Sequence, residues 1–141
     1  MTQEYAVKTV KQISVDLSNE PGTLAVFAES LTKASVLIEG ISVESGHGVS
    51  RVHFVVDKPT EATAVLTELG ENVSIKEILS VTLLERKMGQ IAKIARMLAD
   101  AQINIDVIYL TSAEQGTHPT IYISASNASV TDVAARLAAL A

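Results

Sequence analysis

Asp16-Leu17-Ser18-Asn19-Glu20-Pro21-Gly22-Thr23-Leu24 follows a segment, residues 13–17, in which apolar and polar residues alternate. This alternation predicts a strand with one buried face. We expect Pro21 to open a helix, because the N–H that proline lacks would have no partner at the first helical position. Asn19 is the expected cap of that helix. Gly22 leaves backbone N–H groups uncovered at the positive end of the helix dipole, which favours an anion such as the carboxylate of a small molecule.

The composition indicates a folded protein and excludes several classes of site and function. The 141 residues suffice for one ordinary domain or two very small ones, and 48% apolar with 19% charged residues favours a packed core. The absence of cysteine excludes disulfides, thiol catalysis and Cys-based zinc sites. A net charge of -5 argues against general nucleic-acid binding. The sequence shows no membrane-spanning apolar run and no signal-peptide pattern at its start, so we expect a soluble cytoplasmic protein.

The chain contains an internal repeat. When the sequence is shifted by 67 positions, Gly22 aligns with Gly89, and no gap is needed from residue 19 to the end of the following strand. Further identities along the helix are Ala25 with Ala92, Ala28 with Ala95, Leu31 with Leu98 and Ala34 with Ala101. Two copies of one small supersecondary unit are the expected architecture.

Each copy is predicted to be α+β. In the first copy we expect strands at 10–18, 36–44 and 49–57, helices at 21–34 and 60–69, and a hairpin turn at Ser45-Gly46-His47-Gly48. A β-rich stretch at 72–84 is interpreted as two joined strands. Helices at 88–101 and 129–140 and strands at 103–112 and 119–125 complete the second copy. The order is βαββαβ, a ferredoxin-like arrangement with helices on one face of an antiparallel sheet.

The second copy lacks its final strand, and the N-terminus carries extra residues. Residues 6–15 resemble residues 72–81 at a shift of 66. We therefore predict units at 10–77 and 78–141, with residues 4–9 as the last strand of the second unit, so that the halves are interlocked. The alternative is a frayed N-terminal tail.

The sequence resembles the ACT domain, a small regulatory βαββαβ module, and its repetition resembles free-standing tandem ACT proteins. The resemblance rests on Asn19-Glu20-Pro21-Gly22-Thr23-Leu24 after a strand and on Val36-Leu37-Ile38-Glu39-Gly40-Ile41. The second turn, Glu85-Arg86-Lys87-Met88-Gly89-Gln90-Ile91, keeps the glycine, loses the proline and exchanges acid for base.

Similarity to this family implies binding of a free amino acid where two ACT units meet. The first implied site combines the donors of the first turn (Asn19, Glu20, Pro21, Gly22, Thr23, Leu24) with Asn104, Ile105 and Asp106, which would accept from the ammonium group. The reciprocal site combines Arg86, Lys87, Gly89, Gln90 and Ile91 with Val36, Leu37, Ile38 and Glu39. We expect the two sites to be unequal and favour the first. Alternatively, the glycines only permit tight turns, Asn19 is only a cap, and Asp106 is only a solvated strand residue.

No catalytic constellation is evident, and neither a metal nor a cofactor is expected. His47, His53 and His118 lack metal-site spacing, and no serine lies in a nucleophile elbow. The resemblance implies a regulator of amino-acid metabolism with a metabolic enzyme as a possible partner. The rival hypothesis is a ligand-free interaction module, because strand 103–110 is apolar in both phases. The second apolar face of this strand would be covered by the other unit or by another copy of the protein. We favour a homodimer.

Overall fold

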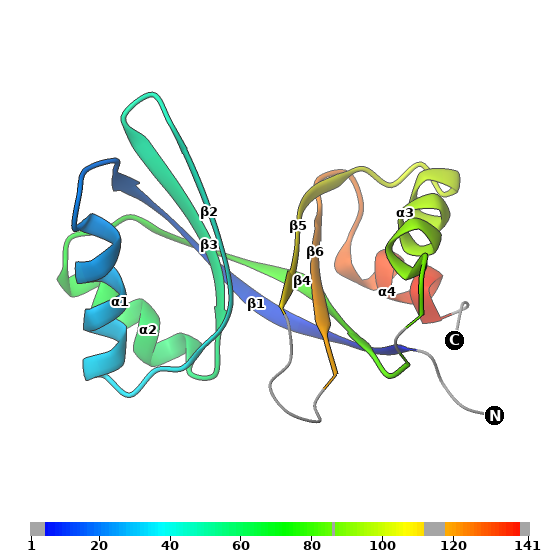
Figure 1. Ribbon diagram of the computed structural model, residues 1–141, viewed down its shortest axis with the longest axis horizontal. Helices are drawn as coiled ribbons and strands as arrows, with labels where there is room; N and C mark the ends of the chain where they lie inside the picture. The colour runs from blue at the N-terminus through cyan, green and yellow to red at the C-terminus, as the bar shows by residue number, and fades with distance from the viewer. Residues whose placement is uncertain (1–4, 86, 112–117, 139–141) are drawn as a thin grey trace. The chain divides into compact units, whose positions relative to one another are not determined.

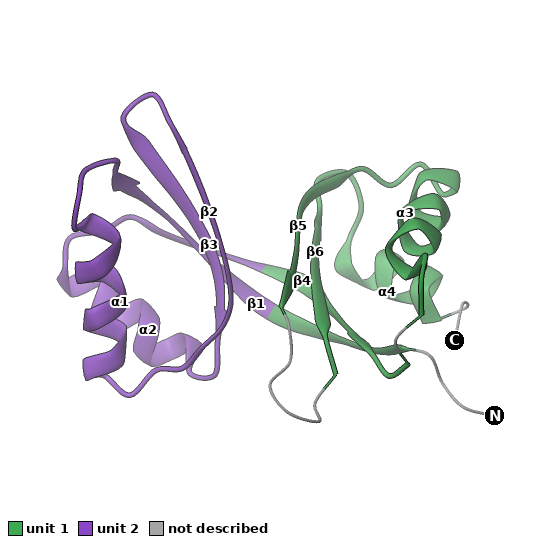
Figure 2. Cartoon of the chain, viewed as in Figure 1, with its two compact units in different colours: residues 1–10, 77–141 green, residues 11–76 purple. Residues whose placement is uncertain are grey.

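The computed structural model describes residues 5–85, 87–111 and 118–138. The chain divides into two compact units (Figure 2). One comprises residues 11–76, and the other comprises residues 1–10 together with 77–141. The strands β1 (Tyr5–Ser18) and β4 (Val73–Leu83) each contribute residues to both units.

The unit of residues 11–76 contains α1 (Thr23–Lys33), β2 (Ile38–Gly46), β3 (Val49–Val56) and α2 (Pro59–Glu68) between its parts of β1 and β4. Its strands are hydrogen-bonded in the order β2-β3-β1-β4. β3 runs antiparallel to β1, with Ile13 opposite Phe54 and Ser18 opposite Val49. The predicted β2–β3 hairpin is confirmed. His47 and Gly48 both have positive φ, 51° and 78°, as a two-residue turn that matches the strand twist requires.

One face of this sheet is covered by α1 and α2 (Figure 1). The alternating residues of β1 and the apolar stripes of both helices meet there because each element has only one apolar face to bury. The rings of Phe27 on α1 and Phe54 on β3 pack edge to face with centroids 5.0 Å apart. The buried core consists of Ile13, Val15, Leu17, Phe27, Leu31, Val36, Val52, Phe54, Val56, Ala62 and Leu66.

The other unit repeats this plan. It contains α3 (Gln90–Asp100), β5 (Ile105–Thr111), β6 (Thr120–Ala125) and α4 (Val130–Ala138), with strand order β1-β4-β6-β5. β6 runs antiparallel to β4 and β5. Its buried core consists of Tyr5, Leu79, Val81, Leu83, Ile94, Leu98, Ile121, Ile123, Ala125, Val133 and Leu137. The α+β, ferredoxin-like fold predicted from the sequence is confirmed.

Three local predictions are wrong. The first helix begins at Thr23, because Gly22 has φ +90°, a left-handed conformation that an α-helix cannot include. Pro21 therefore lies in the turn before the helix, and Asn19 is not its cap, since no side-chain bond caps α1. The stretch 72–84 forms one strand, β4, and not two, because no turn residue interrupts it.

Candidate functional site

The turn before α1 exposes backbone donors. Gly22 occupies the N-cap position, and the Thr23 N–H and Oγ1 both donate to the carbonyl oxygen of Glu20, at 3.3 and 3.0 Å. The N–H groups of Gly22, Leu24 and Ala25 donate to no acceptor among the described residues. These groups lie at the positive end of α1, so the turn can receive an anion.

The β2–β3 hairpin fixes the position of this turn. The Asn19 N–H donates to the Gly48 carbonyl oxygen at 2.9 Å, and Ser50 Oγ lies 3.4 Å from Asn19 Oδ1. Ser50 Oγ is itself 2.8 Å from Ser45 Oγ. Asn19 thus joins the turn to the hairpin, a role that replaces the capping role expected of it.

An exposed ion pair lies on the same unit. Arg51 Nε donates to Asp16 Oδ1 at 2.9 Å, from β3 to β1, and this hydrogen bond lowers the pKa of the Asp16 carboxyl. The two side chains are 61% and 51% exposed, so water screens the pair strongly. Beside it, Ser14 Oγ and His53 Nδ1 are 2.7 Å apart. Arg51 is committed to Asp16 and does not supply a free cation to the first turn.

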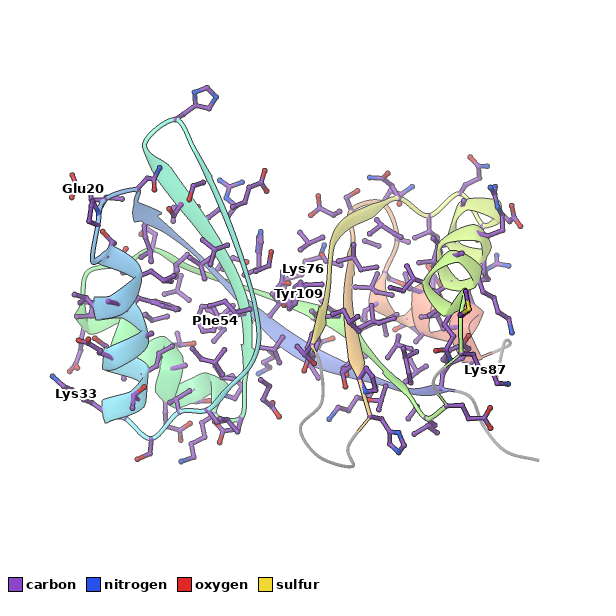
Figure 3. All side chains as sticks on the ribbon, viewed as in Figure 1. Glu20, Lys33, Phe54, Lys76, Lys87 and Tyr109 are labelled. Atoms are coloured by element: carbon purple, nitrogen blue, oxygen red, sulfur yellow. The ribbon has the colours of Figure 1, made fainter. Side chains whose placement is uncertain are left out.

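The turn before α3 is bridged by the Gln90 side chain. Gln90 is only 6% exposed; its Oε1 accepts from the Lys87 N–H at 3.1 Å, and its Nε2 donates to the Glu85 carbonyl oxygen at 2.7 Å. Lys87, labelled in Figure 3, also pairs through Nζ with Glu85 Oε2 at 2.9 Å. Gly89 keeps the left-handed N-cap conformation of Gly22, with φ +82°. Gln90 stays a predicted ligand residue, and both ends of its amide hold the turn.

The remaining predicted residues divide between the units. The first turn shares a unit with Leu37 and Ile38; Leu37 is 62% exposed, and its N–H donates to Asp57 Oδ1 at 2.9 Å. Val36 is buried and Glu39 exposed. The second turn, including the exposed Ile91, shares its unit with Asn104, Ile105 and Asp106. Arg86 lies outside the described residues.

Asn104 has neighbours that the sequence did not predict. Its N–H donates to Asn127 Oδ1 at 2.7 Å, and its Nδ2 donates to Ser126 Oγ at 3.0 Å. Asn127 Nδ2 in turn donates to the Gln102 carbonyl oxygen at 2.9 Å. These bonds brace the entry to β5 and leave the Asn104 amide oxygen and the exposed Asp106 carboxylate as acceptors.

A hollow that the sequence did not predict adjoins the first turn. It has a volume of about 410 Å³ and lies between the start of α1 and the end of α2. Gly22 and Thr23 line it with Leu17, Phe27 and Leu66. Its other lining residues are Pro21, Val26, Leu69 and Glu71. A signal in the sequence was Val26, an apolar residue of the first helix that lies outside its apolar stripe.

The described residues hold no cluster of three or more metal-ligating side chains and no helix able to cross a bilayer. Tyr109 and Tyr122, on β5 and β6, stack with centroids 5.2 Å apart. Burial, and then the neighbouring Tyr122, raise the pKa of the Tyr109 hydroxyl. This hydroxyl therefore keeps its proton over the physiological range.

Comparisons with known proteins agree with the repeated ferredoxin-like fold. The family model described as an ACT domain pair matches residues 8–136. A structure of protein BT0572 from Bacteroides thetaiotaomicron is similar, with TM-score 0.82, 19% identity, and 95% of this chain and 90% of that chain covered. The ligand-free regulatory subunit of aspartate kinase from Thermus thermophilus matches with TM-score 0.66, 15% identity, and coverage of 96% and 95%. No curated protein matches the sequence.

Proposed function

This chain belongs to the ACT domain family, and on that premise we propose that it is a non-enzymatic sensor that binds a free amino acid at its first turn. The observation that carries the proposal is the contrast between the two turns. The first presents the N–H groups of Gly22, Leu24 and Ala25 beside an apolar hollow, whereas the buried Gln90 side chain bonds to Lys87 and Glu85 across the second. A carboxylate at the first turn would receive charge-assisted hydrogen bonds from the free amides.

The ammonium group of the ligand needs an acceptor as well, because a buried charge must be paired. Asn104 and Asp106, with Ile105 between them, stay predicted acceptors for this group. Both polar side chains are exposed, so each has acceptor oxygens to offer. The reciprocal site around Gly89 and Ile91 is the weaker candidate, because the Gln90 amide is engaged by Lys87 and Glu85 and Lys93 replaces the apolar Val26.

We propose regulation of a metabolic enzyme as the purpose of this binding. The similar structures include the regulatory subunit of aspartate kinase from Thermus thermophilus, which supports an enzyme of amino-acid metabolism as the partner. The proposal assigns no catalytic role to this chain. It also retains the predicted cytoplasmic location, where free amino acids and their metabolic enzymes meet.

A homodimer belongs to the proposal. β2 and β5 stand at the ends of the strand order, and each carries two apolar side chains that are 41–52% exposed, Ile41 and Val43 on β2 and Ile108 and Leu110 on β5. An edge strand with exposed apolar residues favours pairing with another chain. Light scattering after size exclusion would show a dimer at micromolar concentration; a monomer would contradict this part.

A thermal-shift screen of the common amino acids tests ligand binding. A ligand that binds only the folded state stabilises it by about 2.7 kcal/mol at a hundredfold excess over its dissociation constant. Gly22→Asp places a carboxylate beside the free amides and should abolish the shift, whereas the uncharged Gly22→Asn should reduce it less. Gly89→Asp is the matched control, because neither glycine has an atom within 4 Å of an added Cβ.

The screen also distinguishes the amino-acid sensor from the second candidate function, a ligand-free interaction module. The exposed edge strands favour a ligand-free interaction module independently of any amino acid. If no amino acid shifts the melting temperature while the protein is dimeric, the interaction module is the better explanation. If Gly22→Asp leaves a ligand-induced shift intact, the ligand binds somewhere other than the first turn.

A further inference from the structure

The hollow beside the first turn has the size and lining of a ligand site. Its volume of about 410 Å³ falls within the range of roughly 300–1,000 Å³ that is typical of small-molecule pockets. All of its lining residues belong to the unit of residues 11–76, between α1 and α2, the two helices shown side by side in Figure 1. Because Gly22 and Thr23 line it, the hollow begins where the proposed carboxylate would lie.

The floor and rim of the hollow are apolar. Leu17, Phe27 and Leu66 form the floor and are 4%, 3% and 0% exposed. Val26 and Leu69 line the hollow while remaining 55% and 46% exposed. An apolar group placed there would remove the exposed surface of both side chains from water, which is favourable in proportion to the buried area.

Among the residues that line the hollow, Thr23 and Glu71 carry polar side chains. Thr23 Oγ1 is committed to the Glu20 carbonyl oxygen, and it lies 3.3 Å from Ser18 Oγ. Glu71 lies in the wall of the hollow because the chain turns back after α2. Gly70 has φ +82°, and the Glu71 N–H donates to the Leu66 carbonyl oxygen. The Glu71 carboxylate forms no ion pair with the described residues, so its charge disfavours acidic ligands.

The repeat shows that this lining is particular to the first copy. At the shift of 67, Val26 corresponds to Lys93, and Thr23 corresponds to the buried Gln90. A cation at the position of Val26 would place a charge over the apolar floor. The second copy therefore lacks the apolar rim of the first.

We infer that the amino acid bound at the first turn has an apolar side chain, seated between α1 and α2 within one unit. This inference rests on the proposed function, because it needs the α-carboxylate at the free amides of Gly22 and its neighbours. It adds the ligand class, an aliphatic amino acid such as L-leucine or L-valine. A hydroxyl or carboxamide placed over Leu17, Phe27 and Leu66 would exchange water for apolar neighbours, whereas an apolar side chain gains free energy from the same burial.

The test compares isosteric ligands by calorimetry on the full chain. L-valine is paired with L-threonine and L-leucine with L-asparagine, since each pair differs in polarity more than in shape. We expect the apolar member to bind about tenfold to a hundredfold more tightly, the discrimination that an apolar pocket achieves against an added hydroxyl. L-aspartate should bind more weakly than L-leucine.

Two variants locate the side chain of the ligand. Val26→Lys copies the residue of the second repeat and should weaken L-leucine binding at least about tenfold, because it places a charge on the rim. Ile75→Lys is the control: it adds the same charge at a 50% exposed position of β4 outside the hollow and should leave the affinity unchanged. Since Val26 is 55% exposed, the variant should fold, and its melting temperature without ligand verifies this.

The outcomes separate the two claims. Binding of L-threonine or L-asparagine that equals or exceeds binding of its apolar partner would overturn the inference and leave the proposed function standing. Binding of L-leucine that Val26→Lys does not weaken would also overturn it. If no amino acid binds, the proposed function falls together with the inference.

Discussion

Replacing the buried Gln90 by leucine tests whether this side chain holds the second turn. Gln90→Leu keeps most of the volume and removes two hydrogen bonds, one from the Lys87 N–H at 3.1 Å and one to the Glu85 carbonyl oxygen at 2.7 Å. Each bond contributes about 1 kcal/mol net, and the half-buried backbone groups left without partners add to the loss. We expect the free energy of unfolding to fall by about 2–3 kcal/mol.

Calorimetry and hydrogen exchange together measure this effect. At roughly 4 °C per kcal/mol for a chain of this size, the melting temperature should fall by about 8–12 °C. Exchange at the Lys87 amide should accelerate far more than exchange at amides of the unit of residues 11–76, because the lost bond protects Lys87 directly.

A matched variant at the first turn provides the control. Thr23 occupies the position of Gln90 in the other copy and donates only one side-chain bond, to the Glu20 carbonyl oxygen. Thr23→Val should therefore cost about 1 kcal/mol or less. Equal melting temperatures for Gln90→Leu and the wild type, with unchanged exchange at Lys87, would refute the role assigned to Gln90.

Three further predictions concern single positions. Gly22→Ala should cost about 1–2 kcal/mol in urea unfolding, from the strain of positive φ alone, because no atom lies within 4 Å of the new Cβ; a larger loss would indicate a clash. Arg51→Met should leave the unfolding midpoint within error and raise the pKa of Asp16 toward its ordinary value, and a clear loss of stability would contradict the screened pair described above. Because the pKa of Tyr109 is raised in the folded state, folding retains a proton that the unfolded chain releases near pH 10, so stability should fall as pH rises above about 10. Unfolding measured against pH should show a smaller fall for Tyr109→Phe, and an identical fall would contradict the assignment.

The fold could be predicted from the sequence because periodicity and repetition report on burial. Ile13, Val15 and Leu17 alternate along β1, and all three are buried. The shift of 67 also aligned Gly22 with Gly89, and both are left-handed N-caps, a conformation that glycine supplies without strain.

The candidate site was less accessible to sequence reasoning. Whether a polar side chain binds a ligand or holds its own turn depends on distances of a few tenths of an ångström, which no pattern encodes. Gln90 was expected to contact ligand, yet it bonds to Lys87 and Glu85. The apolar hollow was missed because Leu17 and Leu66 are 49 positions apart in the sequence, and only the packing of β1 and α2 in one core brings both to its floor.

The division of β1 between two units has a consequence for synthesis on the ribosome. Residues 1–10 emerge first, yet their unit also needs residues 77–141, which emerge last. At about 5–20 residues per second, the 65 residues after position 76 take roughly 3–13 s to make. During that interval Tyr5, a core residue in the finished protein, has none of those later partners. The nascent chain thus carries an unpaired β-segment for seconds, during which a chaperone or a neighbouring nascent copy can bind it.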